Sequence, residues 1–310
     1  MDSNQNIKNI LITGASGMLG GYIKDEFSYP EESFKIFSLG RHIENDFRCD
    51  LTSESPDFGD INFETVVHCA GTEDNSGAMD LNYEGTKRLL KSLDIHPPKH
   101  FVYISSFRIY NPDEGSDLTE FSPASGTGKA GGSKAFAEKT VTDWAQLHGV
   151  VLTIIRPARM FGSRVGGETL RLFNDALNGS YIHIRGNDAR VSLVSALDVA
   201  KAIKKVYTQG GIYNAADGFN PRFIDMMEAM TANAGQQKRM THLPATWAEW
   251  LWRLCRWIPA IDRNLNPEVA AQRMKTLTID GSRLAKDAGI TYHDTIKAIS
   301  RTDPDYPYAE

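Results

Sequence analysis

The chain has 310 residues, of which 41% are hydrophobic, and its formal net charge is −5 at pH 7. This length can form one large core domain together with a smaller lobe. The negative net charge argues against nucleic acid as a partner and gives no general attraction to anionic membranes. No apolar run approaches membrane-spanning length and the polar N-terminus carries no targeting signal, so we expect a cytoplasmic chain without an integral membrane span.

The cysteines are odd in number and lack paired C-x-x-C spacing: Cys49, Cys69 and Cys255. This pattern favours reduced thiols in the protein core over a disulfide framework. The eight histidines and the cysteines show no metal-ligand spacing, so the sequence predicts no metal site.

The stretch over residues 12–20 reads Ile-Thr-Gly-Ala-Ser-Gly-Met-Leu-Gly and follows an apolar run over residues 7–11. Such a run predicts a first β-strand that leads directly into a helix. Gly14 allows a tight turn with positive φ, Gly17 lets the backbone approach a pyrophosphate, and Gly20 lets the helix pack close to the strand. The spacing therefore predicts a dinucleotide site at the N-terminus of this helix.

The rest of the first half alternates strand-like with helix-like segments, which is typical of a parallel sheet with crossover helices. We expect strands over residues 34–39, 65–69, 100–104 and 150–155, helices over residues 83–93 and 133–148, and a loop over residues 111–132. Near-continuous apolar strands suit a sheet that is covered on both faces. The pattern predicts an α/β fold with a Rossmann-type, doubly wound parallel sheet, followed by a smaller, mostly helical C-terminal lobe.

A tryptophan-rich segment over residues 244–259 lies in the predicted lobe. Thr246 and Glu249 have the spacing of a capping box at a helix N-terminus. Large apolar residues recur at helical spacing after it: Trp247, Trp250, Leu251, Leu254 and Ile258, with Trp252 and Trp257 widening the stripe. We expect this stripe to be core, and the alternatives are an apolar substrate pocket or a membrane-surface contact through Arg253 and Arg256.

Several further motifs share the order and spacing of one large family. They are Asp50-Leu51, His68-Cys69-Ala70-Gly71, Leu81 to Thr86, Ser105-Ser106, Gly132-Ser133-Lys134, Arg156-Pro157, Val194 to Ala200, Tyr213 to Ala216 and Asp280 to Ile290. Together with the glycine-rich stretch they make nearly the whole chain resemble the extended short-chain dehydrogenases/reductases, the NAD(P)-dependent epimerase/dehydratase family. The resemblance implies an NAD(P)-binding domain over residues 1–160 with 188–216, and a substrate-binding lobe over residues 161–187 with 217–310.

The resemblance also implies which residues contact the cofactor: Gly14, Ser16, Gly17, Met18, Leu19, Gly20, Arg41, Asp50, Leu51, Ala70, Gly71, Asn82 and Lys134. Ser106 is similar to the family serine that hydrogen-bonds the reacting oxygen. The end of the second predicted strand carries no carboxylate for a ribose 2′-hydroxyl, whereas Arg41 is available for a 2′-phosphate. We therefore expect NADP or NAD, with NADP favoured.

Ala130 departs from the family pattern at the position of greatest chemical importance. The family active site places a tyrosine four residues before the lysine that matches Lys134, and no tyrosine occurs between Tyr110 and Tyr181. Alanine cannot exchange a proton, which leaves Ser106 and Lys134 as a dyad. Three interpretations remain open: an engineered Tyr-to-Ala substitution, a natural enzyme that takes its acid from Ser106, Lys134, substrate or water, and a nucleotide-binding regulator without catalysis.

Two arginines are candidates for substrate binding. Arg190 resembles the arginine by which nucleotide-sugar epimerases hold a diphosphate, and Arg159 stands where many sugar-nucleotide enzymes have asparagine. We expect an epimerase, dehydratase or reductase scaffold that acts on a nucleotide sugar by transient hydride transfer, with activity impaired by the missing tyrosine. The alternatives are a catalytically silent regulator and a reductase of apolar hydroxy-ketones similar to 3β-hydroxysteroid dehydrogenases. By resemblance, the helices over residues 83–93 and 133–148 would pair across a homodimer.

Overall fold

The computed structural model describes residues 8–28, 34–111, 113, 115–126, 128–163, 165–233, 240–258 and 265–301. The first residue of the predicted run over 7–11, Pro259 at the end of the tryptophan-rich segment, and the other parts of the two predicted domains that fall between these ranges lie outside the described residues.

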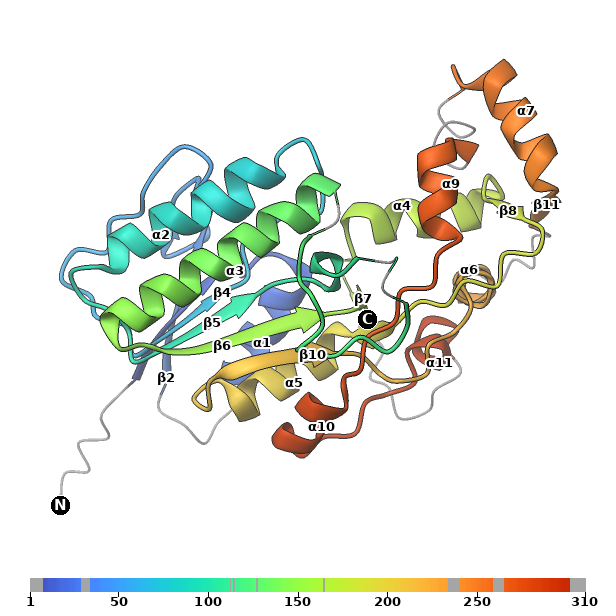
Figure 1. Cartoon of the computed structure of the whole chain (residues 1–310). Coiled ribbons are helices and arrows are strands. Elements are labelled where there is room, and N and C mark those ends of the chain that lie inside the picture. The colour runs from blue at the N-terminus through green and yellow to red at the C-terminus, as the bar shows by residue number, and fades with distance from the viewer. Residues whose placement is uncertain are drawn as a thin grey trace.

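Seven parallel strands form the central sheet in the order β10-β6-β5-β4-β1-β2-β3 (Figure 1). Their bounds are β1 Lys8–Thr13, β2 Phe34–Gly40, β3 Phe47–Arg48, β4 Thr65–His68, β5 His100–Ile104, β6 Val151–Pro157 and β10 Gly211–Ala215. The strand order reverses between β1 and β4, and ligands of doubly wound sheets bind outside the strand ends at such a point. The predicted Rossmann-type fold is confirmed.

Helices cover both faces of this sheet. On one face lie α1 (Met18–Ser28) and α5 (Ala196–Val206), and on the other lie η1 (Met79–Gly85), α2 (Thr86–Leu93) and α3 (Gly128–His148). Strand β1 shows how one sequence serves both layers, because Ile10 and Ile12 pack into the cluster with α1 while Leu11 packs into the cluster with α2 and α3. All three side chains are fully buried.

Two predicted helix boundaries need correction. Helix α3 begins at Gly128, five residues before the predicted start, so the predicted loop over residues 111–132 ends earlier than expected. The segment that was expected to be one helix over residues 83–93 is a π-helix, η1, followed by α2. Three glycines between residues 128 and 132 favour a loop by propensity, and packing against the chain after β5 overrides that preference.

The C-terminal part of the chain is mostly helical, as predicted. It contains α4 (Gly167–Asn178), α6 (Phe223–Asn233), α7 (Ala245–Cys255), α9 (Pro267–Arg273), α10 (Ser282–Ala288) and α11 (Thr295–Ile299). Two small parallel pairs accompany them: β7 (Arg159–Phe161) with β9 (Leu193–Ser195), and β8 (Ile182–Ile184) with β11 (Thr241–Leu243). A cluster that includes Leu172, Met227 and Ile299 joins α4, α6 and α11. The proposed domain boundaries stay a prediction.

Helix α7 differs from its prediction in two respects. It begins at Ala245 after Pro244, so Thr246 lies inside the helix and the predicted capping box with Glu249 does not form. The predicted stripe is core only in part: Trp247 and Trp250 face solvent, whereas Leu251 and Trp252 pack with the buried Ala248. Within the described ranges, the structure contains no helix with the length and hydropathy needed to cross a membrane.

Candidate active site

The glycine-rich turn between β1 and α1 forms a tight cradle at the strand ends. Gly14 has φ of 67°, and a Cβ atom there would lie 2.9 Å from the Ala70 backbone nitrogen. A Cβ on Gly20 would lie 2.2 Å from the Gly14 carbonyl oxygen, which also accepts a hydrogen bond from the Gly17 N–H at 2.9 Å. Helix α1 then starts at Met18 with N–H groups that have no intrahelical acceptor. The turn therefore fits a pyrophosphate.

A buried histidine ties this cradle to the helix layer. The Thr86 hydroxyl donates to the Asn82 carbonyl oxygen, so it accepts from Nε2 of His68 at 2.9 Å. Nδ1 of His68 then accepts from the Thr13 hydroxyl at 2.6 Å, and the same hydroxyl accepts from the Ala70 N–H at 3.1 Å. Burial, with a smaller contribution from the charge of Lys134, lowers the pKa of His68 to about 3. One neutral tautomer therefore satisfies every group in this chain.

A first pocket of about 210 Å³ opens beside the cradle. Eight of the predicted cofactor residues line it: Gly14, Ser16, Gly17, Arg41, Asp50, Leu51, Ala70 and Gly71. Hydrogen bonds from the Thr52 N–H and hydroxyl lower the pKa of the Asp50 carboxyl, and the nearby charge of Arg41 acts in the same direction. The pocket combines apolar groups with the Asp50 carboxylate and has an exposed guanidinium, that of Arg41, in its lining.

Other predicted cofactor residues lie beneath this surface. Leu19 and Gly20 are buried in α1, and Asn82 is buried under the loop that follows β4. Asn82 accepts a hydrogen bond from the Thr72 N–H at 2.8 Å and donates to the Thr72 carbonyl and the Ser133 hydroxyl. Asn82 of η1 therefore fixes the position of the loop after β4, through Thr72, and contacts α3 through Ser133.

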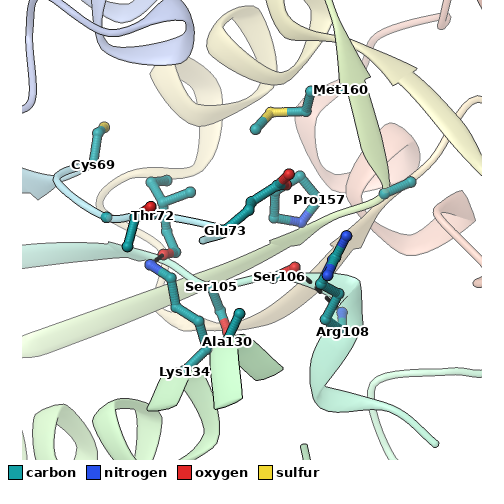
Figure 2. A pocket seen from close by; sticks show the side chains of 13 residues that line it. Cys69, Thr72, Glu73, Ser105, Ser106, Arg108, Ala130, Lys134, Pro157 and Met160 are labelled. Carbon is teal, nitrogen blue, oxygen red and sulfur yellow. Dashed lines mark hydrogen bonds between the residues drawn. The ribbon is translucent and has the colours of Figure 1, made fainter. Parts of the chain in front are cut away.

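A second pocket of about 130 Å³ adjoins the first, and both are lined by Cys69 and Gly71 (Figure 2). The structure brings all three predicted catalytic positions together there: Ser106, Ala130 and Lys134. The pair of pockets thus forms one elongated site along the carboxyl ends of the strands, as a dinucleotide with a substrate beside it requires.

Lys134 reaches this second pocket from within α3. It is buried and is the seventh residue of that helix, whereas the predicted helix over residues 133–148 would have made it the second. Its Nζ donates to the Ile104 carbonyl oxygen at 2.7 Å, and a Cβ on Gly71 would lie 2.9 Å from the same nitrogen. Burial lowers the pKa of Lys134 to about 8, against the opposing charges of Cys69, Glu138 and Glu73.

Ser106 follows β5 and caps the short helix η2 (Phe107–Ile109). Its hydroxyl oxygen accepts a hydrogen bond from the Arg108 N–H at 3.2 Å, so the hydroxyl proton can still be donated to a ligand. Ser105 beside it is buried, and its hydroxyl has no hydrogen-bond partner among the described residues. Both serines line the second pocket.

Ala130 is buried in the pocket wall, where its methyl group offers no exchangeable proton. Its backbone N–H donates to Oδ1 of Asn75 at 3.0 Å, which ties the start of α3 to the loop after β4. Glu73 in that loop supplies the one carboxylate among the described residues that line this pocket, and Figure 2 shows its side chain extending across the pocket toward Pro157. Sequence reasoning missed Glu73 because it stands in a loop outside every recognisable motif.

Arginine side chains gather beside the second pocket, where Arg108 is part of the lining and Arg159 is not. Nη1 of Arg159 lies 3.6 Å from the Glu168 carboxylate, which also pairs with Arg108. Burial would raise the pKa of Glu168, but the charges of Arg159, Arg108 and Arg273 outweigh it and lower that pKa to about 2. The Arg159 side chain is 10% exposed, and its Nε has no hydrogen-bond partner in the described part of the chain. Three guanidinium charges thus act on the Glu168 carboxylate.

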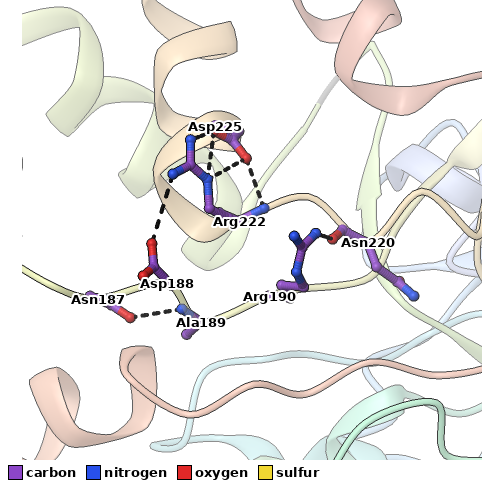
Figure 3. Close-up of polar contacts among 7 residues, drawn as sticks. All are labelled: Asn187, Asp188, Ala189, Arg190, Asn220, Arg222 and Asp225. Atoms are coloured by element: carbon purple, nitrogen blue, oxygen red, sulfur yellow. Dashed lines mark hydrogen bonds and ion pairs between the residues drawn. The ribbon is translucent and has the colours of Figure 1, made fainter.

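Arg190 lies on the surface and does not line either pocket as the structure describes them (Figure 3). Its Nη1 donates to the Asn220 carbonyl oxygen at 2.9 Å, while the neighbouring Arg222 pairs with Asp225 and Asp188. The adjacent Val191 instead packs against the cluster between α4 and α6. A shift of one residue in extended chain turns a side chain to the opposite side, so the two positions face different surroundings.

Known proteins resemble this chain in sequence and fold. It is 24% identical over 259 residues to N-acetyl-alpha-D-glucosaminyl-diphospho-ditrans,octacis-undecaprenol 4-epimerase of Escherichia coli O157:H7, covering 76% of this chain and 75% of that protein. UDP-glucose 4-epimerase of Thermotoga maritima has a similar fold, with a TM-score of 0.72 and 16% identity over 95% of this chain and 97% of that one. RMD of Pseudomonas aeruginosa, complexed with NADPH, gives a TM-score of 0.70 at 18% identity, covering 95% and 98%.

A family model describes two thirds of the chain. Residues 10–216 match the NAD dependent epimerase/dehydratase family, and this range holds the glycine cradle, both pockets and the strands that form them. The chain belongs to the NAD-dependent epimerase/dehydratase family.

Proposed function

We propose that this chain acts with a nicotinamide dinucleotide on a sugar attached to a diphosphate, as an epimerase, dehydratase or reductase. The observation that carries the proposal is one continuous site, in which the glycine cradle leads past Gly71 to Lys134 and Ser106. The bound dinucleotide would supply the hydride acceptor or donor. The cradle, Asp50 and Lys134 would hold it, in a chain that we expect to be cytoplasmic.

The substrate class is proposed from charge. Arg159 lies beside Arg108, which lines the second pocket, and Nε of Arg159 has no hydrogen-bond partner among the described residues. Guanidinium groups suit bidentate phosphate binding. We propose these two rather than Arg190, whose side chain bonds the Asn220 backbone. The names of the relatives support either carrier, since one acts on a polyprenol-linked and another on a UDP-linked sugar.

We propose Glu73 as the group that exchanges the proton in place of a tyrosine at position 130. In the oxidation direction a substrate hydroxyl would give its proton to the Glu73 carboxylate while the carbon gives up a hydride, and a carbonyl would form. Ser106 would donate a hydrogen bond to the reacting oxygen. The positive charge of Lys134 would stabilise negative charge that develops on that oxygen.

Cofactor preference is proposed from Arg41, which lines the first pocket and is exposed there. A guanidinium at this place favours a 2′-phosphate, so NADPH should bind more tightly than NADH. Calorimetry with both dinucleotides checks this, and Arg41→Ala should remove the difference. Absence of heat with either dinucleotide, oxidised or reduced, would contradict the proposed function as a whole.

The catalytic test compares the native chain with Ala130→Tyr, Glu73→Gln and the double variant. Reduction of bound NAD(P)⁺ is followed with UDP-glucose, UDP-N-acetylglucosamine and N-acetylglucosaminyl-diphospho-undecaprenol as substrates. We expect Glu73→Gln to lose about 10²–10⁴ in rate in the native chain, the usual contribution of general acid-base catalysis. In the Ala130→Tyr background, the same change should cost about tenfold or less, because the introduced phenol then exchanges the proton.

The outcomes separate the remaining interpretations. An unchanged rate in Glu73→Gln would contradict its role and leave the proposed function intact. Tight dinucleotide binding without hydride transfer in either the native chain or Ala130→Tyr would support a silent regulator. Turnover of an apolar hydroxy-ketone, with none of the sugar diphosphates reacting, would support the reductase alternative.

A further inference from the structure

Helix α7 exposes large apolar side chains that the sequence predicted to be buried. Trp247, Trp250 and Leu254 recur at spacings of three and four residues, and Trp257 continues the spacing just after the helix. These four side chains are between 54% and 77% exposed. Spacings of three and four place them on one face. These four exposed side chains form one apolar surface, which is called the tryptophan stripe below.

The opposite side of α7 already has its packing partner. Ala248, Leu251 and Trp252 pack against Ile184 of β8 and Leu265, which precedes α9. This contact fixes the rotation of the helix, so the tryptophan stripe cannot turn inward without breaking it. Figure 1 shows α7 at the outer end of the lobe, beyond α4 and α9. The packing of Ala248, Leu251 and Trp252 on the inner side of α7 thus keeps the tryptophan stripe exposed.

The chemistry beside the stripe indicates what covers it. Arg253 lies beside the stripe and pairs with Glu249 at 2.7 Å, while Arg256, just after the helix, lies over the Trp252 ring at 5.9 Å. These three residues leave one net positive charge at this end of α7. The Trp247 and Trp250 rings meet edge to face at 6.3 Å, and a hollow lined by these rings and Thr246 opens between them. Indole rings with a polar N–H, bordered by arginine, suit the interface between lipid headgroups and acyl chains.

We propose that α7 rests on an anionic membrane surface through Trp247, Trp250, Leu254 and Trp257. The chain as a whole carries a charge of −5, so attraction must come from this local surface rather than from net charge. The proposal deepens the proposed function in one respect, because a sugar diphosphate whose carrier is a polyprenol stays in the bilayer. Docking would bring the lobe to that substrate.

Vesicle co-sedimentation of the full chain tests the proposal without any substrate. Vesicles of phosphatidylethanolamine with phosphatidylglycerol should bind the chain, and vesicles of phosphatidylcholine alone should bind it less. Trp247→Glu combined with Trp250→Glu should weaken binding by about tenfold or more, because buried aromatic area drives interfacial binding. Phe121→Ser is the matched control, since Phe121 is an exposed aromatic residue elsewhere on the molecule and should leave binding unchanged.

Three results would overturn the proposal: no binding of the native chain, equal binding by the tryptophan variant, or a change of oligomeric mass in that variant. The last result would make the stripe an interface between copies of the chain. Dinucleotide affinity is measured on the same samples. Retained dinucleotide affinity with lost vesicle binding separates this proposal from the proposed function, and circular dichroism checks that the variant is folded.

Discussion

His68 joins two strands of the sheet to helix α2 while remaining uncharged. Its two ring nitrogens bond Thr13, the last residue of β1, and Thr86, the first residue of α2, and Thr13 in turn holds the Ala70 N–H at the edge of the first pocket. An imidazolium would need an acceptor at Nδ1, where the threonine hydroxyl now donates. The cradle is therefore supported by a residue that must stay neutral.

This requirement predicts a pH dependence of stability. Burial lowers the pKa of His68 from 6.5 to about 3 in the folded chain, so below pH 6.5 the unfolded chain binds a proton that the folded chain does not. The contribution to the free energy of unfolding is fully present above pH 6.5 and is lost as the pH falls toward 3, on the order of 3–5 kcal/mol at most. Proton NMR should show a His68 ring signal that does not titrate near pH 6.5, and titration there would contradict the assignment.

The single-residue details of the site divide into those that sequence could predict and those that it could not. Ser106, Lys134 and the missing tyrosine at Ala130 follow from motif spacing, and all three positions meet in one pocket. Glu73 belongs to no sequence motif. It lies in a loop, and only the path of the folded chain brings it to the site, so the sequence could not predict its place. The sequence also could not predict which way the Arg190 side chain points, because successive side chains in an extended segment point to opposite sides.

At the scale of elements, α3 and η2 touch through one glycine. A Cβ on Gly131 would lie 2.2 Å from the carbonyl oxygen of Arg108, whereas a Cβ on Gly132 would meet nothing within 4 Å. The close approach brings Ala130 and Lys134 of one element beside Ser106 of the other. The pocket walls therefore depend on the absence of a single methyl group.

This pair of glycines provides a matched test. Gly131→Ala should destabilise the chain by about 1–3 kcal/mol, because the methyl group would push η2 and α3 apart. Gly132→Ala should instead stabilise it by about 0.5–1 kcal/mol, since alanine is the better residue inside a helix and has free space there. Urea unfolding measures both, and equal effects at the two positions would contradict the packing described here.

The same contact explains why the start of α3 could not be predicted. Helix propensity disfavours the glycines at 128, 131 and 132, and only the tertiary contact shows that one of them is required in the helix. The apolar strands β1, β2, β4, β5 and β6 were predictable, because their composition carries the signal. The short strand β3 and the pairs β7–β9 and β8–β11 have too few residues for a periodic pattern.

At the scale of the whole molecule, α2 and α3 form an outer layer that carries exposed apolar residues. Phe136 and Leu147 of α3 both face solvent, and Phe136 lies 5.8 Å from the Tyr83 ring, measured between ring centroids. These features support the predicted homodimer, in which the two helices would pair with their copies as a four-helix bundle. Exposed apolar patches of this kind favour association.

Phe136→Glu combined with Leu147→Glu should prevent the predicted dimer from forming, because the charges would have to be buried in the paired helices. Analytical ultracentrifugation measures the mass, and Phe121→Glu, at an exposed aromatic position away from this layer, should leave it unchanged. A native chain that sediments as a monomer would contradict the dimer.

The tryptophan stripe on α7 could be predicted from the sequence as an apolar helix face but not as an exposed one. Periodicity identifies an apolar face and does not identify what covers it.

Cys69 stands where the two pockets meet, and its chemistry affects how the site withstands oxidants. Burial raises the pKa of the Cys69 thiol to about 12, although the ammonium group of Lys134 opposes this. At neutral pH only about one thiol in 10⁵ is then ionised, and the thiolate is the form that peroxides and alkylating reagents attack. The thiol that lines both pockets is therefore poorly reactive, so oxidative stress and thiol reagents should leave the connection between the two pockets unmodified.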